Sequence, residues 1–170
     1  MRKIKVQLSE YNPNWEQQYE VEQKGIEKAL GDSAIRIEHI GSTSIKRLKA
    51  KPIIDILVGV QSLDEVPSFI DALREIDYEY VPKIKFKDRK FFRKGLWGQG
   101  TIHLHICEYN SNEWTEKLLF RDYLRSYPQA ANEYAVLKNQ LASKYRFDRS
   151  TYTKEKEPFI QMIIQKAKML

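Results

Sequence analysis

The sequence is short of cysteine and lacks any long apolar run, and each shortage excludes a class of protein. The single cysteine, Cys107, cannot form an internal disulfide, which favours a reducing compartment and leads us to expect a cytoplasmic protein. No stretch approaches the roughly 18 consecutive apolar residues of a membrane-spanning helix, so no membrane partner is expected. The start, MRKIKVQLSEYNPNW, contains basic residues but no apolar segment, so we expect no signal peptide.

The phosphate-binding motif GxxxxGK is also missing, which excludes a P-loop NTPase. Repeats, low-complexity tracts and Gly/Ser linkers are absent. A chain of 170 residues without linkers suits a single domain over residues 1–170, with a sheet core at about 1–110 and a helical part at about 111–170.

The net charge of +6 favours anionic partners. Such basicity is common among soluble proteins, so nucleic acid is kept only as an alternative to a nucleotide or another phosphorylated small molecule. The sequence sets no oligomeric state.

Hydrophobic periodicity and turn residues divide the chain into alternating elements. Asn12 and Pro13 are typical of a helix start and Gly31 of a helix end. Further helices are expected at 63–77, 112–126, 129–145 and 151–169. Strands are expected at 34–40, 51–60, 78–86, 89–95 and 101–109. This order predicts an α+β fold with a helical C-terminal third.

Asp55 interrupts an otherwise apolar strand, IIDILVGV, and such a carboxylate costs several kcal/mol to bury without a partner. Because side chains alternate along a strand, Asp55 shares a face with Leu57, and His103 shares a face with His105. If the two strands lie in one sheet with their aliphatic faces aligned, Asp55 and both histidines converge. They would then suit a divalent metal, whereas the alternative is that the histidines simply face solvent or polar neighbours.

The segment GSTSIKRLKAK, just before this strand, combines hydroxyl groups with four cations. A Gly-Ser turn that leads into a helix can bind an anion through N–H and hydroxyl groups. Two lysines, Lys138 and Lys156, fall inside the apolar stripes of the last two helices. Their ammonium groups either extend outward to solvent or reach a phosphate in a cleft beside the sheet. The candidate phosphate-binding residues are therefore Gly41, Ser42, Thr43, Ser44, Lys51, Lys138 and Lys156.

With these residues in hand, the chain closely resembles the GrpB family over nearly its whole length. The shared motifs are YNPNW, EHIGSTSI…AKPIIDILVGV, HLHI, FRDYLR, YAVLKNQLA and YTKEKEPFI. The resemblance implies the nucleotidyltransferase-like fold of polymerase-β-type enzymes, a mixed sheet with flanking helices. Some relatives resemble an extra domain fused to dephospho-CoA kinases, which hints at coenzyme A or nucleotide metabolism.

The resemblance also implies roles for individual residues. Gly41 and Ser42 match the phosphate-binding Gly-Ser pair of the superfamily, and Asp55 matches its first metal-binding, catalytic acid. The second acid is missing, since Leu57 occupies its position. Where a third acid usually stands, the chain offers His103 and His105. Two-metal catalysis needs carboxylates to hold both ions, so these departures count against that mechanism.

Two functions follow, and the sequence leaves both open. The first is metal-assisted transfer of a nucleotidyl or other phosphate-containing group, with Asp55, His103 and His105 holding Mg²⁺ or Mn²⁺, or Zn²⁺ through the histidines. The second is a non-catalytic module that binds a nucleotide or a coenzyme-A-type ligand. An RNA-associated protein that uses its basic face is a third reading, and it would bind less tightly as salt increases.

Overall fold

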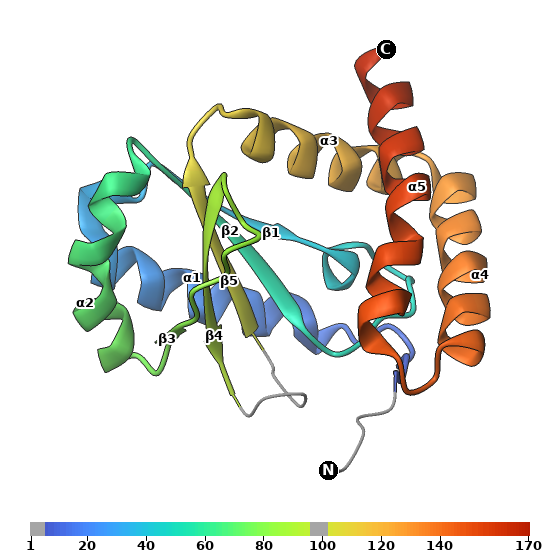
Figure 1. The fold of residues 1–170 in the computed structure, drawn as a ribbon, viewed down its shortest axis with the longest axis horizontal. Helices are drawn as coiled ribbons and strands as arrows, with labels where there is room; N and C mark the ends of the chain where they lie inside the picture. Colours follow the sequence, from blue (N-terminus) through green and yellow to red (C-terminus); the bar gives the residue numbers. More distant parts are fainter. Residues whose placement is uncertain (1–5, 96–101) are drawn as a thin grey trace.

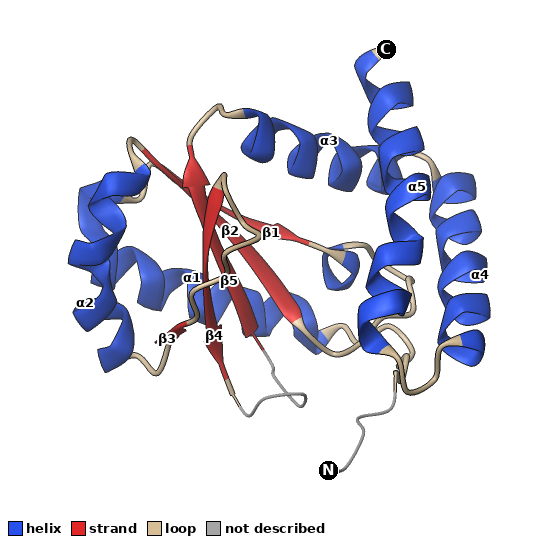
Figure 2. Ribbon diagram, viewed as in Figure 1, coloured by secondary structure: helices blue, strands red, loops and turns tan. Residues whose placement is uncertain are grey.

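The protein is described by a computed structural model, which covers residues 6–95 and 102–170. Its centre is a five-stranded mixed sheet in the order β1-β2-β5-β4-β3 (Figures 1 and 2). The central pair, β2 and β5, runs parallel, and each other neighbouring pair is antiparallel. The strands are β1 (Arg36–Ile40), β2 (Ile54–Val60), β3 (Glu79–Tyr80), β4 (Arg89–Lys94) and β5 (Ile102–Glu108).

Two helices, α1 (Asn14–Leu30) and α2 (Ile70–Glu75), cover one face of the sheet. The helix starts at Asn14, one residue later than expected, so Pro13 rather than Asn12 precedes its first residue; the Asn12 side-chain oxygen still accepts a hydrogen bond from the Asn14 N–H at 2.9 Å. The helix ends at Gly31, where φ is +56°. Apolar side chains of both helices meet the aliphatic face of β2, which packs them into the main core.

The other face carries α3 (Asn112–Ser126), and α4 (Pro128–Lys144) and α5 (Arg149–Lys168) lie next to it (Figure 1). The three expected C-terminal helices are thus confirmed to within two residues at each end. Trp114 of α3 packs against Leu57 and Cys107 of the sheet. Beyond the sheet, α3, α4 and α5 enclose a smaller core together with Ile45 and Leu48, which follow β1.

Two expected elements are wrong in part, and proline is the physical reason for both. The expected helix at 63–77 is a 3-10 helix (Leu63–Phe69) followed by the short α2, because in an α-helix the Pro67 ring would clash with the carbonyl four residues earlier. The expected strand at 78–86 shrinks to β3, since Pro82 cannot donate to a strand ladder. Ile84 beyond it is 98% exposed.

Thr101, the expected start of the last strand, lies outside the described residues, as do the first five residues of the chain. Within the part that is described, no helix has both the length and the apolar character needed to cross a membrane.

Candidate functional site

The parallel pairing of β2 and β5 brings the predicted acid and histidines together. Asp55 lies opposite His103 in the register, and Leu57 lies opposite His105, so all four share one face. The Asp55 Oδ1 atom is 3.4 Å from His105 Nε2 and 3.7 Å from His103 Nδ1. The convergence expected from strand alternation is therefore what the structure shows.

Burial and mutual charge set the protonation of this group. Burial would raise the pKa of Asp55, but the hydrogen bond from His105, the charges that both histidines carry when protonated and the charge of Lys51 hold it below its ordinary value. Burial lowers the pKa of His103 to about 4 and also lowers the pKa of His105. At neutral pH the group is thus one carboxylate between two neutral imidazoles. Phe91 of β4 packs against both rings, with centroids 5.1 and 5.3 Å away.

Two of the predicted lysines, Lys51 and Lys156, are near enough to this carboxylate for their charges to interact with it. Their ammonium nitrogens are 5.2 and 4.8 Å from the centroid of the Tyr152 ring, which both lysines contact. Burial, with the charges of Lys156 and Arg149, lowers the pKa of Lys51 to about 7, although Asp55 opposes this shift. Burial also lowers the pKa of Lys156. We call these five residues the Asp55 cluster: Asp55, His103, His105, Lys51 and Lys156.

Lys138 turns inward, so the outward alternative is wrong for this residue. The side chain is buried, with only 2% of the residue exposed, and its ammonium group donates to the Lys49 carbonyl. It also lies 5.0 Å from the centroid of the Tyr134 ring. Burial and the charges of Lys156 and Lys51 lower its pKa to about 7. Lys138 therefore adds positive charge near the Asp55 cluster, while the backbone occupies at least one of its donors.

The predicted phosphate-binding turn is a 3-10 helix over Ser42–Ser44, and it begins at Gly41 against Asp55. A Cβ atom at Gly41, whose φ is +75°, would lie 2.4 Å from Asp55 Oδ2. Only glycine therefore lets the carboxylate approach the turn so closely. The Ser42 side chain interacts with the phenol group of Tyr134.

The other two hydroxyl groups of this turn are occupied within the protein. The Thr43 hydroxyl donates to the Ile53 carbonyl at 3.0 Å and lies 3.0 Å from His39 Nε2. Because its one proton goes to Ile53, the hydroxyl accepts from His39, whose pKa burial lowers to about 4. The Ser44 hydroxyl donates to the Gly41 carbonyl. Of the three hydroxyl groups, that of Ser42 meets a side chain, Tyr134, and the other two bond to the backbone.

The residue types in the Asp55 cluster suit a divalent metal, but their positions do not form a metal site. One carboxylate and two imidazoles are suitable ligands for such an ion. However, no three or more His, Cys, Asp or Glu side chains among residues 6–95 and 102–170 are placed to hold a metal. Leu57, at the position of the second acid, is 0% exposed and packs against Trp114. A two-metal site does not fit, and Mg²⁺, Mn²⁺ or Zn²⁺ at Asp55, His103 and His105 stays a prediction.

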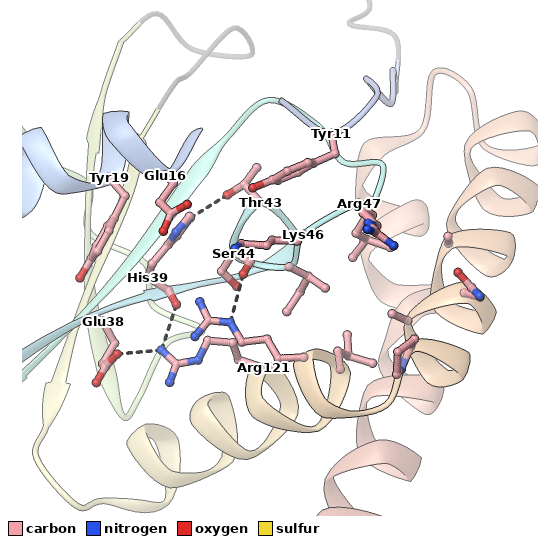
Figure 3. Close-up of a pocket in the computed structure, with 18 of the residues that line it drawn as sticks. Tyr11, Glu16, Tyr19, Glu38, His39, Thr43, Ser44, Lys46, Arg47 and Arg121 are labelled. Atoms are coloured by element: carbon pink, nitrogen blue, oxygen red, sulfur yellow. Dashed lines mark hydrogen bonds and ion pairs between the residues drawn. The ribbon is translucent and has the colours of Figure 1, made fainter. Parts of the chain in front are cut away.

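Sequence reasoning missed Arg149 and Tyr152, although Tyr152 stands four residues before Lys156 on α5 and so shares its face. It also missed a cavity of about 760 Å³ on the other side of the Gly41–Ser44 turn. Thr43, Ser44 and Arg121 help to line this cavity (Figure 3), but neither Asp55 nor His103 does. No sequence signal marks the cavity, because its walls come from separate segments.

Comparison with known proteins identifies relatives over nearly the whole chain. A family model described as GrpB protein matches residues 5–166. The glutamate-rich protein GrpB of Alkalihalophilus pseudofirmus is 38% identical over 168 residues, which cover 96% of this chain and 97% of that protein. A dephospho-CoA kinase of Mycobacterium bovis is 26% identical over 182 residues, but the match spans only 44% of its length.

Solved structures show the same relationship at the level of the fold. The crystal structure of the conserved protein GrpB from Enterococcus faecalis has a TM-score of 0.86 and 36% identity, and covers 95% of this chain and 96% of that one. The Cid1 poly(U) polymerase has a TM-score of 0.54 and 14% identity over 79% of this chain and 44% of its own. The second match shows that the chain shares its fold with part of this polymerase.

Proposed function

This chain belongs to the GrpB family, and we propose that it binds the phosphate groups of a nucleotide or a related phosphorylated small molecule at the Asp55 cluster. The observation that carries the proposal is the crowding of three buried or half-buried lysines, two of which, Lys51 and Lys156, are near enough to the Asp55 carboxylate to interact with it. Lys51, Lys138 and Lys156 all have lowered pKa values, and each is lowered first by burial.

A phosphate group would remove the cost of this crowding. Buried lysines near one another lose stability in their charged form, and one carboxylate cannot neutralise three of them. Phosphate oxygens between Lys51 and Lys156 would restore the charged ammonium groups and accept their protons in hydrogen bonds. Ser42, which is not occupied by the backbone, extends the same site. Asp55 would orient the lysines and repel a ligand that enters too deeply.

Binding is favoured over two-metal transfer because the second acid is replaced by a buried leucine. Leu57 is buried and packs against Trp114. This position therefore has no carboxylate to hold a second ion and no space for the ion. Metal-assisted transfer is the second candidate, and it is supported by the position of Asp55 directly against the Gly41–Ser44 turn. The two functions are distinguished by whether an added metal changes the affinity of the protein for the ligand.

We expect Lys156→Met to weaken the binding of ATP, pyrophosphate or a coenzyme A precursor at least tenfold, because it removes a charge that faces the phosphates. Lys154→Met is the matched control, since Lys154 is exposed on the same helix and should leave Kd unchanged. Isothermal titration calorimetry measures both. Equal effects of the two variants, or no binding by the wild-type protein, would contradict the proposal.

The same titrations test the lysine mechanism and the metal. Near pH 7–8, binding should take up protons, because the ligand raises lysine pKa values that are about 7 in the free protein; the heat then depends on the buffer. Mg²⁺, Mn²⁺ or Zn²⁺ should change Kd little if the site is a binding module. A metal-dependent gain that Asp55→Asn abolishes would instead favour transfer.

A further inference from the structure

We propose that the cavity on the other side of the Gly41–Ser44 turn is a second binding site, for a small molecule with an oxyanion at one end and an amine at the other. The cavity has a volume of about 760 Å³ and lies between α1, β1, the segment after β1, α3 and α4 (Figure 3). This proposal is independent of phosphate binding at the Asp55 cluster, which does not line the cavity.

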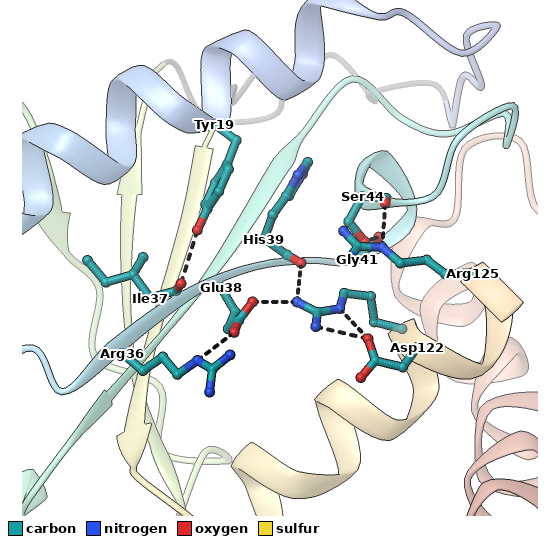
Figure 4. A network of polar contacts seen from close by, with 10 residues as sticks. Tyr19, Arg36, Ile37, Glu38, His39, Gly41, Ser44, Asp122 and Arg125 are labelled. Atoms are coloured by element: carbon teal, nitrogen blue, oxygen red, sulfur yellow. Dashed lines mark hydrogen bonds and ion pairs between the residues drawn. The ribbon is translucent and has the colours of Figure 1, made fainter.

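The oxyanion end is built around Arg125. Its Nε donates to the Ser44 carbonyl at 3.1 Å, which fixes the guanidinium beside the turn (Figure 4). Arg121, one turn earlier, is neutralised by Glu38 at 2.8 Å and Asp122 at 2.9 Å. Among the described residues, no carboxylate forms an ion pair with Arg125. A guanidinium held through Nε still presents two NH₂ groups, the fork that binds a carboxylate or phosphate.

The positive charge of Arg121 is unfavourable to that of Arg125, and a bound anion would relieve this repulsion. Burial and the neighbouring charge of Arg121 lower the pKa of Arg125. Lys46 and Arg47 add two exposed cations to the wall of the cavity. Arg47 has a φ of +69°, a left-handed conformation that is costly for any residue with a Cβ. Backbone strain of this kind is concentrated at binding sites, where the bound molecule depends on the position of the strained residue.

The amine end lies on α1, across the cavity. Glu16 and Glu20, one turn apart, both line the cavity and form no ion pair with any described residue. Like charges at this spacing repel each other on a helix, which a cation between them would relieve. Glu16 is close enough for its charge to act on Arg125. The cavity is therefore polarised, and it suits a zwitterion better than a simple anion.

Glu16 and Glu20 form the acidic wall of the cavity, and Tyr19, which lies between them in the sequence, holds this wall in place. Its ring stacks on His39 with centroids 4.7 Å apart, and its hydroxyl donates to the Ile37 carbonyl at 3.1 Å (Figure 4). Both contacts tie α1 to β1, so the acidic and basic walls are fixed relative to each other before a ligand binds. A preformed site of this kind loses little entropy on binding.

The test uses the dipeptide alanyl-alanine and phosphoethanolamine, which carry a carboxylate and a phosphate respectively, each together with an amine. N-acetylated and C-amidated alanyl-alanine each lack one charge. Binding is followed by NMR titration of the whole chain. We expect both modified dipeptides to bind at least tenfold more weakly than alanyl-alanine. The tighter of the two zwitterions identifies the oxyanion.

Variants locate the binding at the two walls. Arg125→Gln and Glu16→Gln should each raise Kd at least tenfold, whereas Arg74→Gln, on α2 and outside the cavity, should leave it unchanged. Circular dichroism confirms that each variant is folded. The proposal is overturned if neither zwitterion binds at 20 mM, if the modified dipeptides bind as well as the parent, or if Arg125→Gln and Arg74→Gln behave alike.

Discussion

Gly41 and Asp55 depend on each other, because the carboxylate occupies the space where any other residue at position 41 would place its Cβ. The Gly-Ser pair therefore serves first to admit the acid, and only then to present a hydroxyl. Asp55 in turn reaches both histidines from this position. A change at Gly41 should therefore affect the Asp55 cluster as well as the backbone.

Gly41→Ala should lower the free energy of unfolding by about 3 kcal/mol or more, since it adds a collision with Asp55 to the cost of a positive φ. Gly31→Ala is the matched control: φ is also positive there, but a Cβ would meet no atom within 4 Å. We expect it to cost about 1–2 kcal/mol, from backbone strain alone. Urea denaturation measures both.

Repeating the substitution in a protein that lacks the Asp55 carboxylate separates the collision with Asp55 from the backbone strain. In an Asp55→Ala protein the carboxylate is gone and only the Cβ of residue 55 remains, 3.0 Å from the added atom, so the cost of Gly41→Ala should fall toward that of Gly31→Ala. An unchanged cost of Gly41→Ala in that background would show that contact with Asp55 is not the cause.

At the same scale, strand alternation was sufficient to place Asp55 with both histidines, because one parallel register fixes every pair along β2 and β5. The roles of the turn hydroxyls could not be predicted in this way. Thr43 donates to Ile53, ten residues away, and such a contact depends on how the loop returns to the sheet. Local sequence contains no signal for it.

Among the elements, α3 is attached to β1 through Arg121. Its guanidinium pairs with Glu38 at 2.8 Å and also donates to the His39 carbonyl at 3.1 Å (Figure 4). Burial alone would lower the pKa of Arg121, but the hydrogen bonds and charges of Glu38 and Asp122 raise it. The contact holds the basic wall of the cavity against the edge of the sheet.

Arg121→Ala should lower the free energy of unfolding by about 3 kcal/mol, because it leaves the His39 carbonyl without this donor and the half-buried Glu38 with only the exposed Arg36 as a partner. Arg36→Ala removes the other arginine that pairs with Glu38, but Arg36 is largely exposed, so its loss should cost less than about 1 kcal/mol. Chemical denaturation compares them. Equal costs would mean that Arg121 contributes no more than a surface ion pair.

The helices were well predicted where their apolar stripes run unbroken, as in α3, α4 and α5. Prediction was wrong where proline competes with periodicity. Val66, Phe69 and Leu73 are all buried as a helical stripe requires, yet Pro67 forces the first part of the segment into a 3-10 helix. The pattern therefore identified the buried face correctly and the type of helix incorrectly.

Over the whole molecule, stability should depend on pH through its buried histidines. His39 and His103 have pKa values of about 4, and that of His105 is also lowered, against about 6.5 in an unfolded chain. Between these values the unfolded state binds more protons, so protonation favours unfolding.

The free energy of unfolding should therefore fall by about 3 kcal/mol or more as the pH drops from 6.5 to 4. Urea denaturation at several pH values measures this slope. His39→Gln, which retains a donor for Thr43, should flatten the slope, because one of the titrating groups is gone. A stability that is level across this range would contradict the assignment of neutral, buried imidazoles.

The cavity is the part of the molecule that sequence could least predict. Its walls combine α1, β1, the 43–48 segment, α3 and α4, which are far apart in the chain. Arg125 and Glu16 are ordinary surface residues in the sequence, and only the packing of the helices around the edge of the sheet makes them face one space.

The contacts of Tyr19 and Arg121 also affect how this protein meets other chains. β1 is an edge strand, and Tyr19 and Arg121 bind the Ile37 and His39 carbonyls from outside the sheet. A free edge of this kind is a template for strand addition, through which proteins aggregate or recruit extended peptides. Here the template is already occupied by side chains, so assembly by extending the sheet at β1 is blocked unless α1 and α3 first move away.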